Sequence, residues 1–189
     1  MTIRRHAGPT DGFQVLNQAL SARGHNVHRL FALGGAPQVT SPLPIYQITL
    51  QEAAQPDPIG AAKQTGWYYP VIGGAAPGIA KIYFDGTTSK YEGITQGILP
   101  TRLIQAGYVA DQQLGNVGEE YEPRMLLVPS LHIAALWLHA PFDHFISLLD
   151  GDPPGSAPLV VTTDIRSALN TALRARGNPA AAGGQRPTN

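Results

Sequence analysis

Residues 131–145 hold the side chains of this chain whose types and spacing could do chemistry. They read LHIAALWLHAPFDHF and contain three of the six histidines, an aspartate and one of the two tryptophans. Two imidazoles and one carboxylate can form a facial triad that binds iron or another divalent metal. Such a site requires the backbone to bring His139, Asp143 and His144 to one point.

A helix over residues 131–139 would not bring two histidines to one metal ion. His132 and His139 would lie about 10 Å apart along the axis, at a rise of about 1.5 Å per residue. The usual helical metal pair is four residues apart, as in H-E-x-x-H, and this segment has no such pair. A helix therefore does not favour metal binding here.

A strand interpretation gives the same residues a better arrangement. Pro141 and Asp143 indicate a turn, so residues 140–143 would form a four-residue loop with His139 directly opposite His144. The hairpin end would then hold the two imidazoles and the carboxylate of a metal site. The other interpretation is that the histidines flank a solvent-facing turn while Asp143 hydrogen-bonds the turn backbone.

These observations give two hypotheses about function. The favoured one is a non-enzymatic interaction or structural subunit that self-associates, with no cofactor. The alternative is a metal-dependent enzyme that uses a divalent metal at His139, Asp143 and His144. An enzyme would also bring a further carboxylate such as Glu120 or Asp150 into a concave pocket.

Self-association is predicted from the surface composition and from the hairpin. Thirteen basic residues balance thirteen acidic ones, and charged residues make up 14% of the chain, against roughly 25% in typical soluble domains. Both hairpin faces are apolar, and helices were expected to cover only one of them, leaving the second face to loops or another copy. We therefore expect Trp137, Phe142 and Phe145 to form the interface of a homo-oligomer or with a protein partner.

Charge and hydropathy argue against other partner classes. A net charge of zero predicts no nucleic-acid partner, because phosphate binding needs a basic surface. The longest apolar stretch is fourteen residues and is interrupted by Pro129, so it is too short for a membrane span of about 20 residues. Residues 1–9 have no apolar region of the signal-peptide kind, so we expect a cytoplasmic protein. The chain has no cysteine, which excludes thiol nucleophiles and cysteine-ligated metal centres.

A second acidic group lies in the segment GEEYEPR. Glu119, Glu120 and Glu122 could supply paired carboxylates, although a solvated lead-in to the next strand, with Arg124 as a neighbour, is the ordinary explanation.

The elements that must position these residues are predicted from periodicity. Runs of aromatic and β-branched residues predict strands over residues 45–50, 67–72, 79–84, 90–96 and 121–128. Turn signals separate them, among them Asp85-Gly86, which favours a hairpin. Amphipathic helices are predicted from Thr10 or Asp11 to Gly24, from Pro100 to Leu114 with Tyr108 on the inner side, and from Thr162 to Gly177.

This order of elements predicts an α+β fold. The sheet would be antiparallel, a meander plus a hairpin, packed against about three helices. Residues 26–33 are a further candidate strand. We expect one domain over residues 1–177 and a disordered tail over residues 178–189, which has no hydrophobic pattern.

Overall fold

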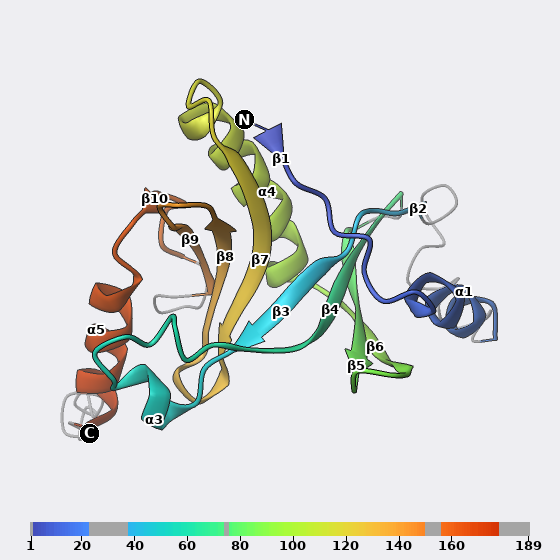
Figure 1. Ribbon diagram of the computed structural model, residues 1–189, viewed down its shortest axis with the longest axis horizontal. Helices are drawn as coiled ribbons and strands as arrows, with labels where there is room; N and C mark the ends of the chain where they lie inside the picture. The colour runs from blue at the N-terminus through green and yellow to red at the C-terminus, as the bar shows by residue number, and fades with distance from the viewer. Residues whose placement is uncertain (1, 23–37, 74–75, 150–155, 178–189) are drawn as a thin grey trace, which may run out of the picture.

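The computed structural model describes residues 2–22, 38–73, 76–149 and 156–177. The candidate strand at 26–33 and the predicted tail at 178–189 lie outside the described residues. Within them the fold is α+β, as the sequence predicts (Figure 1).

Ten strands form one mixed sheet. Their bounds are β1 Thr2–Ile3, β2 Gln38–Val39, β3 Leu43–Gln47, β4 Lys63–Ile72, β5 Gly78–Phe84, β6 Ser89–Gln96, β7 Glu120–Val128, β8 Ile133–His139, β9 His144–Leu149 and β10 Val161–Thr162. The order across the sheet is β10-β9-β8-β7-β3-β4-β5-β6, with β1 beside β7 and β2 beside β4. The predicted meander is β4-β5-β6, and the predicted hairpin is β8-β9.

Most strand pairs are antiparallel, but two pairs are parallel. β3 and β1 both run parallel to β7, and they pair with different stretches of it. The β3–β7 pairing joins the meander to the hairpin region in one sheet. Antiparallel pairing was predicted throughout, so these two pairs are a correction; strands of this kind are joined by long connections that have no local turn signal.

The Asp85-Gly86 hairpin between β5 and β6 is confirmed. Gly86 has a φ of 98°, a backbone conformation that favours glycine. Oδ1 of Asp85 accepts hydrogen bonds from the backbone N–H groups of Thr87 and Thr88 at 2.9 and 2.8 Å. These N–H groups hold the pKa of Asp85 well below its usual range.

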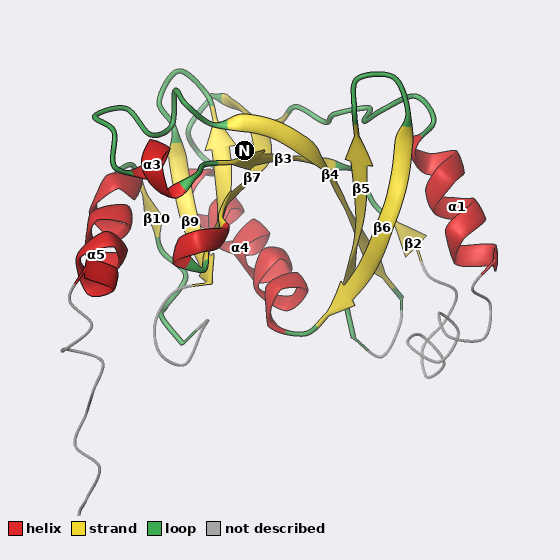
Figure 2. Ribbon diagram, turned by 90° about the horizontal axis from the view of Figure 1, so that it is seen from below, coloured by secondary structure: helices red, strands yellow, loops and turns green. Residues whose placement is uncertain are grey.

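Four α-helices lie within the described residues: α1 Gly12–Ala22, α3 Leu50–Ala53, α4 Ile98–Leu114 and α5 Ile165–Gly177. Figure 2 shows α1 and α5 at opposite ends of the curved sheet, with α4 between its two halves. None of the helices in the described ranges is long and apolar enough to cross a membrane.

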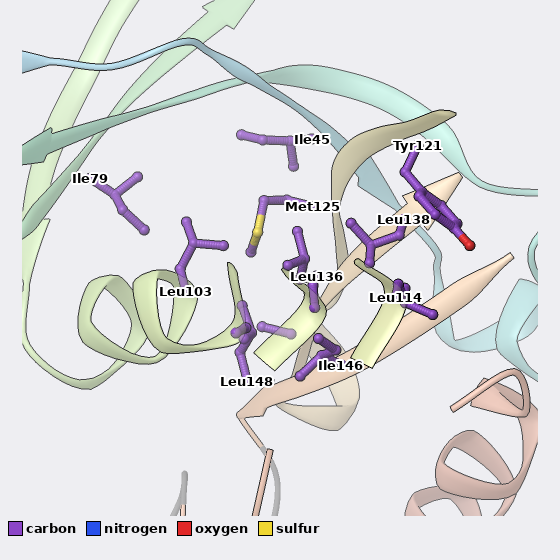
Figure 3. Close-up of a cluster of buried hydrophobic side chains, with 13 residues drawn as sticks. Ile45, Ile79, Leu103, Leu114, Tyr121, Met125, Leu136, Leu138, Ile146 and Leu148 are labelled. Atoms are coloured by element: carbon purple, nitrogen blue, oxygen red, sulfur yellow. The ribbon is translucent and has the colours of Figure 1, made fainter. Parts of the chain in front are cut away.

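The main core lies between α4 and one face of the sheet (Figure 3). It collects buried apolar side chains from the helix and from strands of both halves, including Ile45, Ile79, Leu103, Met125, Leu136 and Ile146. Since hydrophobic stabilisation scales with apolar area buried, α4 links the meander and the hairpin energetically.

The second face of the hairpin is also covered by helices. Ile165 and Leu169 of α5 and Ala53 of α3 pack with Trp137 and Phe145 in a separate buried cluster. We expected this face to be left for loops or another copy, and that expectation is wrong. The short α3 is a single helical turn, and Thr49 and Glu52 form a capping box at its start.

Candidate functional site

The register of the β8–β9 hairpin differs by one residue from the predicted one. Leu138, not His139, pairs with His144, and Trp137 pairs with Phe145. The turn therefore holds five residues, 139–143, where four were predicted. A slip of one residue moves side chains to the opposite face of a sheet, so this difference decides what the hairpin end can do.

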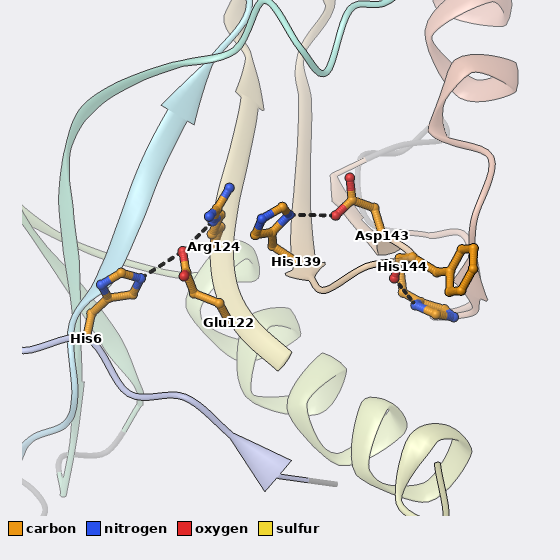
Figure 4. Close-up of polar contacts among 7 residues, drawn as sticks. His6, Glu122, Arg124, His139, Asp143 and His144 are labelled. Carbon is orange, nitrogen blue, oxygen red and sulfur yellow. Dashed lines mark hydrogen bonds and ion pairs between the residues drawn. The ribbon is translucent and has the colours of Figure 1, made fainter. Parts of the chain in front are cut away.

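The turn separates the two histidines and keeps one of them with the aspartate. Nδ1 of His139 lies 2.8 Å from Oδ1 of Asp143, and the ring N–H donates to the carboxylate across the turn (Figure 4). His144 lies on the other face, where its ring meets the edge of Tyr121 at 5.6 Å between centroids. Its Nδ1 is 3.0 Å from the Phe142 carbonyl oxygen and donates to it.

The structure thus brings together His139 and Asp143 but not His144. No group of three or more histidine and carboxylate side chains in the described residues is arranged to hold a metal ion. The metal site at His139, Asp143 and His144 stays a prediction, and it would need a different conformation of the turn.

The three predicted interface residues differ in exposure. Trp137 and Phe145 are only 4% and 2% exposed, whereas Phe142 at the tip of the turn is 70% exposed. Of the three, Phe142 alone offers surface to a partner. The predicted interface stays a prediction and depends on Phe142.

A polar cluster of Glu122, Arg124 and His6 lies where β7 faces the N-terminal segment (Figure 4), and its arginine contacts the Trp137 ring. Nε of Arg124 lies 2.5 Å from Oε1 of Glu122, and Nε2 of His6 lies 2.9 Å from the same oxygen. Both the glutamate and the arginine side chains are 14% exposed. We call Glu122, Arg124 and His6 the Arg124 cluster.

The charge of Glu122 is stabilised by its neighbours. Burial alone would raise its pKa, but the hydrogen bond from Arg124 and the close contact with His6 outweigh burial, and the pKa is lowered. Glu122 is therefore ionised at neutral pH. Its carboxylate accepts the hydrogen bond from Arg124 and lies against the His6 ring. A carboxylate with a lowered pKa is a poor general base.

Sequence reasoning anticipated only part of this cluster. The pairing of Glu122 with Arg124 follows from alternation along one strand, because residues two apart share a face. Arg4, from the N-terminal segment, contacts Glu120 at 3.3 Å. A cation therefore lies beside each of the carboxylates of Glu120 and Glu122. His6 was missed, since nothing in the local sequence relates it to a strand 116 positions away.

A large hollow in the described part of the chain lies between α4 and the strands that diverge above it. Its volume is about 930 Å³, and its lining includes Ile3, Pro42, Ile72, Ile104, Gly107 and Tyr108. We call it the α4 cleft. Leu103, Leu136 and Leu138 also line it, so it reaches down to residues of the main core.

Tyr108 was predicted to lie on the inner side of its helix, but it is 69% exposed. The sheet splits here, because β3 and β1 pair with different stretches of β7. As a result, none of the described strands covers this side of α4 completely. The helix face that the sequence periodicity predicts to lie in the core lines the cleft instead.

Comparison with protein-family models, curated proteins and solved structures finds no match to this chain. The chain is an α+β domain with a mixed sheet, an apolar cleft on one face and a partly buried charged cluster on the other.

Proposed function

We propose that this protein binds a small, largely apolar molecule in the α4 cleft. Ligand pockets of this kind usually occupy about 300–1,000 Å³ and are lined mostly by apolar side chains with a few polar groups. The α4 cleft has a volume of about 930 Å³, and Arg5, His6 and Asp111 supply charged or hydrogen-bonding groups to its lining.

The observation that carries the proposal is Gly107, in the interior of α4. Glycine in a helix interior costs about 1 kcal/mol relative to alanine. A Cβ at this position would meet no atom of the described chain within 4 Å, so packing among these residues gives no reason for a glycine. Its effect is to keep the floor of the cleft open, which is what close approach of a ligand to the helix backbone requires.

The first prediction separates binding from folding. Replacing Gly107 with leucine should fill the cleft and weaken binding of the neutral fluorophore N-phenyl-1-naphthylamine by about tenfold or more, a change equal to about 1.4 kcal/mol. The same variant should be more stable to urea than the wild type, by up to about 1 kcal/mol, because leucine is a better helix former. Fluorescence titration and urea unfolding measure the two effects.

Gln113→Leu is the matched control, since Gln113 lies exposed on α4 and does not line the cleft. It should leave binding of the fluorophore unchanged. Equal binding by the wild type and Gly107→Leu, or no binding by the wild type, would contradict the proposal. A change in molecular mass on Gly107→Leu would instead indicate that a second copy of the chain covers the cleft.

Self-association through the hairpin turn is the second candidate, and the exposure of Phe142 favours it. Phe142 and Val117, both exposed, line one shallow hollow with Pro141. An exposed apolar group of this kind on a surface with few charges is typical of a contact site.

Light scattering tests this second candidate. We expect a mass near twice the 20.1 kDa of one chain, reduced towards that of one chain by Phe142→Asp, which places a charge in the contact. Val160→Asp is the control, since Val160 is also an exposed apolar residue but does not line the hollow. A mass of one chain at every concentration would rule out self-association.

A further inference from the structure

Arg124 packs against two aromatic rings that also contact each other. Its guanidinium carbon lies 4.8 Å from the centroid of the Tyr46 ring and 4.7 Å from that of Trp137. The two rings meet edge to face, 5.3 Å apart. Such stacking stabilises a guanidinium and restricts its orientation, so the direction of the group is fixed by the fold.

Among the described residues, hydrogen bonding occupies one edge of this guanidinium. Nε donates to Glu122, which is held in turn by His6. Nη1 and Nη2 donate to no group among the described residues, and neither is among the buried polar atoms that lack a partner. The free end of the fork is therefore accessible to solvent and oriented before any ligand arrives.

His139 supplies a second polar group beside the arginine. It pairs with Glu122 across the β7–β8 ladder, and its ring contacts the Trp137 ring edge to face at 5.4 Å. Because Nδ1 is engaged by Asp143, Nε2 is the ring nitrogen left to meet a ligand. The Asp143 contact also fixes the orientation of the ring.

There is room next to these groups for the rest of a molecule. Trp137 and His139 line an open hollow of about 630 Å³, whose other side is formed by the 57–60 loop and the start of α5. Arg124 adjoins this hollow through the Trp137 ring and is not part of its lining. The charged residues of the lining are Asp57, Asp143, Asp164 and Arg166. Because carboxylates outnumber the one guanidinium there, a ligand held by Arg124 would place an uncharged or cationic part in the hollow.

From these contacts we infer that Arg124 anchors a site for a single oxyanion group, a carboxylate or a phosphate, with His139 as the second contact. A planar guanidinium end binds either group through two parallel N–H···O bonds. The site lies on the opposite sheet face from the core beneath α4, and its argument does not depend on a ligand in the α4 cleft.

The test uses the full chain with inorganic phosphate and with acetate as separate probes. In the wild type, the NMR signals of the Arg124 guanidinium should shift and saturate with one of the two anions, and the anion that binds more tightly identifies the ligand class. Arg124→Lys should weaken binding about tenfold or more, since it keeps the charge but loses one hydrogen bond to a charged group. Trp fluorescence provides the second readout.

Arg4→Lys is the matched control, because Arg4 also pairs with a glutamate of β7 but is exposed. It should change the affinity less than about twofold, the effect of a surface charge. The inference is overturned if neither anion shifts the wild-type signals, if Arg124→Lys binds as well as the wild type, or if Arg4→Lys loses as much affinity. The wild-type titration decides the question even if Arg124→Lys does not fold.

Discussion

The free energy of unfolding of the Trp137→Ala variant is expected to be about 3–5 kcal/mol lower than that of the wild type. This is the usual effect of removing a large aromatic side chain from a core. Trp137 is nearly fully buried, stacks on Phe145 at 6.0 Å and supports Arg124. Since domains are stable by about 5–15 kcal/mol, this single change should remove a large part of the total. Urea unfolding followed by circular dichroism measures it.

Phe142→Ala is the control for this prediction, because it removes an aromatic residue of the same hairpin from an exposed position. At concentrations where the chain is a monomer it should change stability by less than about 0.5 kcal/mol. Equal losses in the two variants would mean that the hairpin is packed differently, with Trp137 no more buried than the turn.

The parts of the fold that could be predicted from sequence are those with local signals. Alternating and β-branched runs identify the meander strands, and Asp85-Gly86 identifies their turn, because the residues that make each contact are close in the chain. The parallel pairing of Ile45 with Met125 has no such signal. This parallel pairing depends on α4 packing against both halves of the sheet. The periodicity of a sequence indicates that a helix has an apolar face, but it does not indicate which residues pack against that face.

The hairpin shows why the candidate metal site was harder to predict than its strands. Both strands were identified, but the register depends on whether Asp143 bonds the turn backbone or His139. The structure has the second arrangement, which lengthens the turn by one residue and places His144 on the other face. The sequence contains both partners and does not indicate which bond is made.

The two candidate binding sites likewise arise from tertiary contacts. In the sequence Gly107 is one more residue of an amphipathic helix. That it keeps the floor of the α4 cleft open follows only from the divergence of the neighbouring strands. In the sequence Arg124 is one cation of a charged segment, and only the strand order brings the Tyr46 and Trp137 rings against it. His6 contacts Glu122 and also lines the α4 cleft, so the N-terminal segment is a part of both sites.

Gly66 should be the glycine of the sheet that tolerates substitution least. It lies in β4 between Ile45 of β3 and Tyr83 of β5, and a Cβ there would come within 2.6 Å of the Ile82 carbonyl oxygen. Because the obstacle is backbone, relief requires two strands to separate. Gly66→Val is therefore expected to lower the free energy of unfolding by about 1–3 kcal/mol or more, although valine favours strands.

Gly93→Val tests whether this loss comes from the close approach or from glycine as such. Gly93 lies in β6 of the same sheet, and a Cβ there would meet nothing within 4 Å. A β-branched residue should then stabilise the strand, by up to about 1 kcal/mol, so urea unfolding should give changes of opposite sign in the two variants. Changes of the same sign would show that strand spacing at Gly66 is not what requires the glycine.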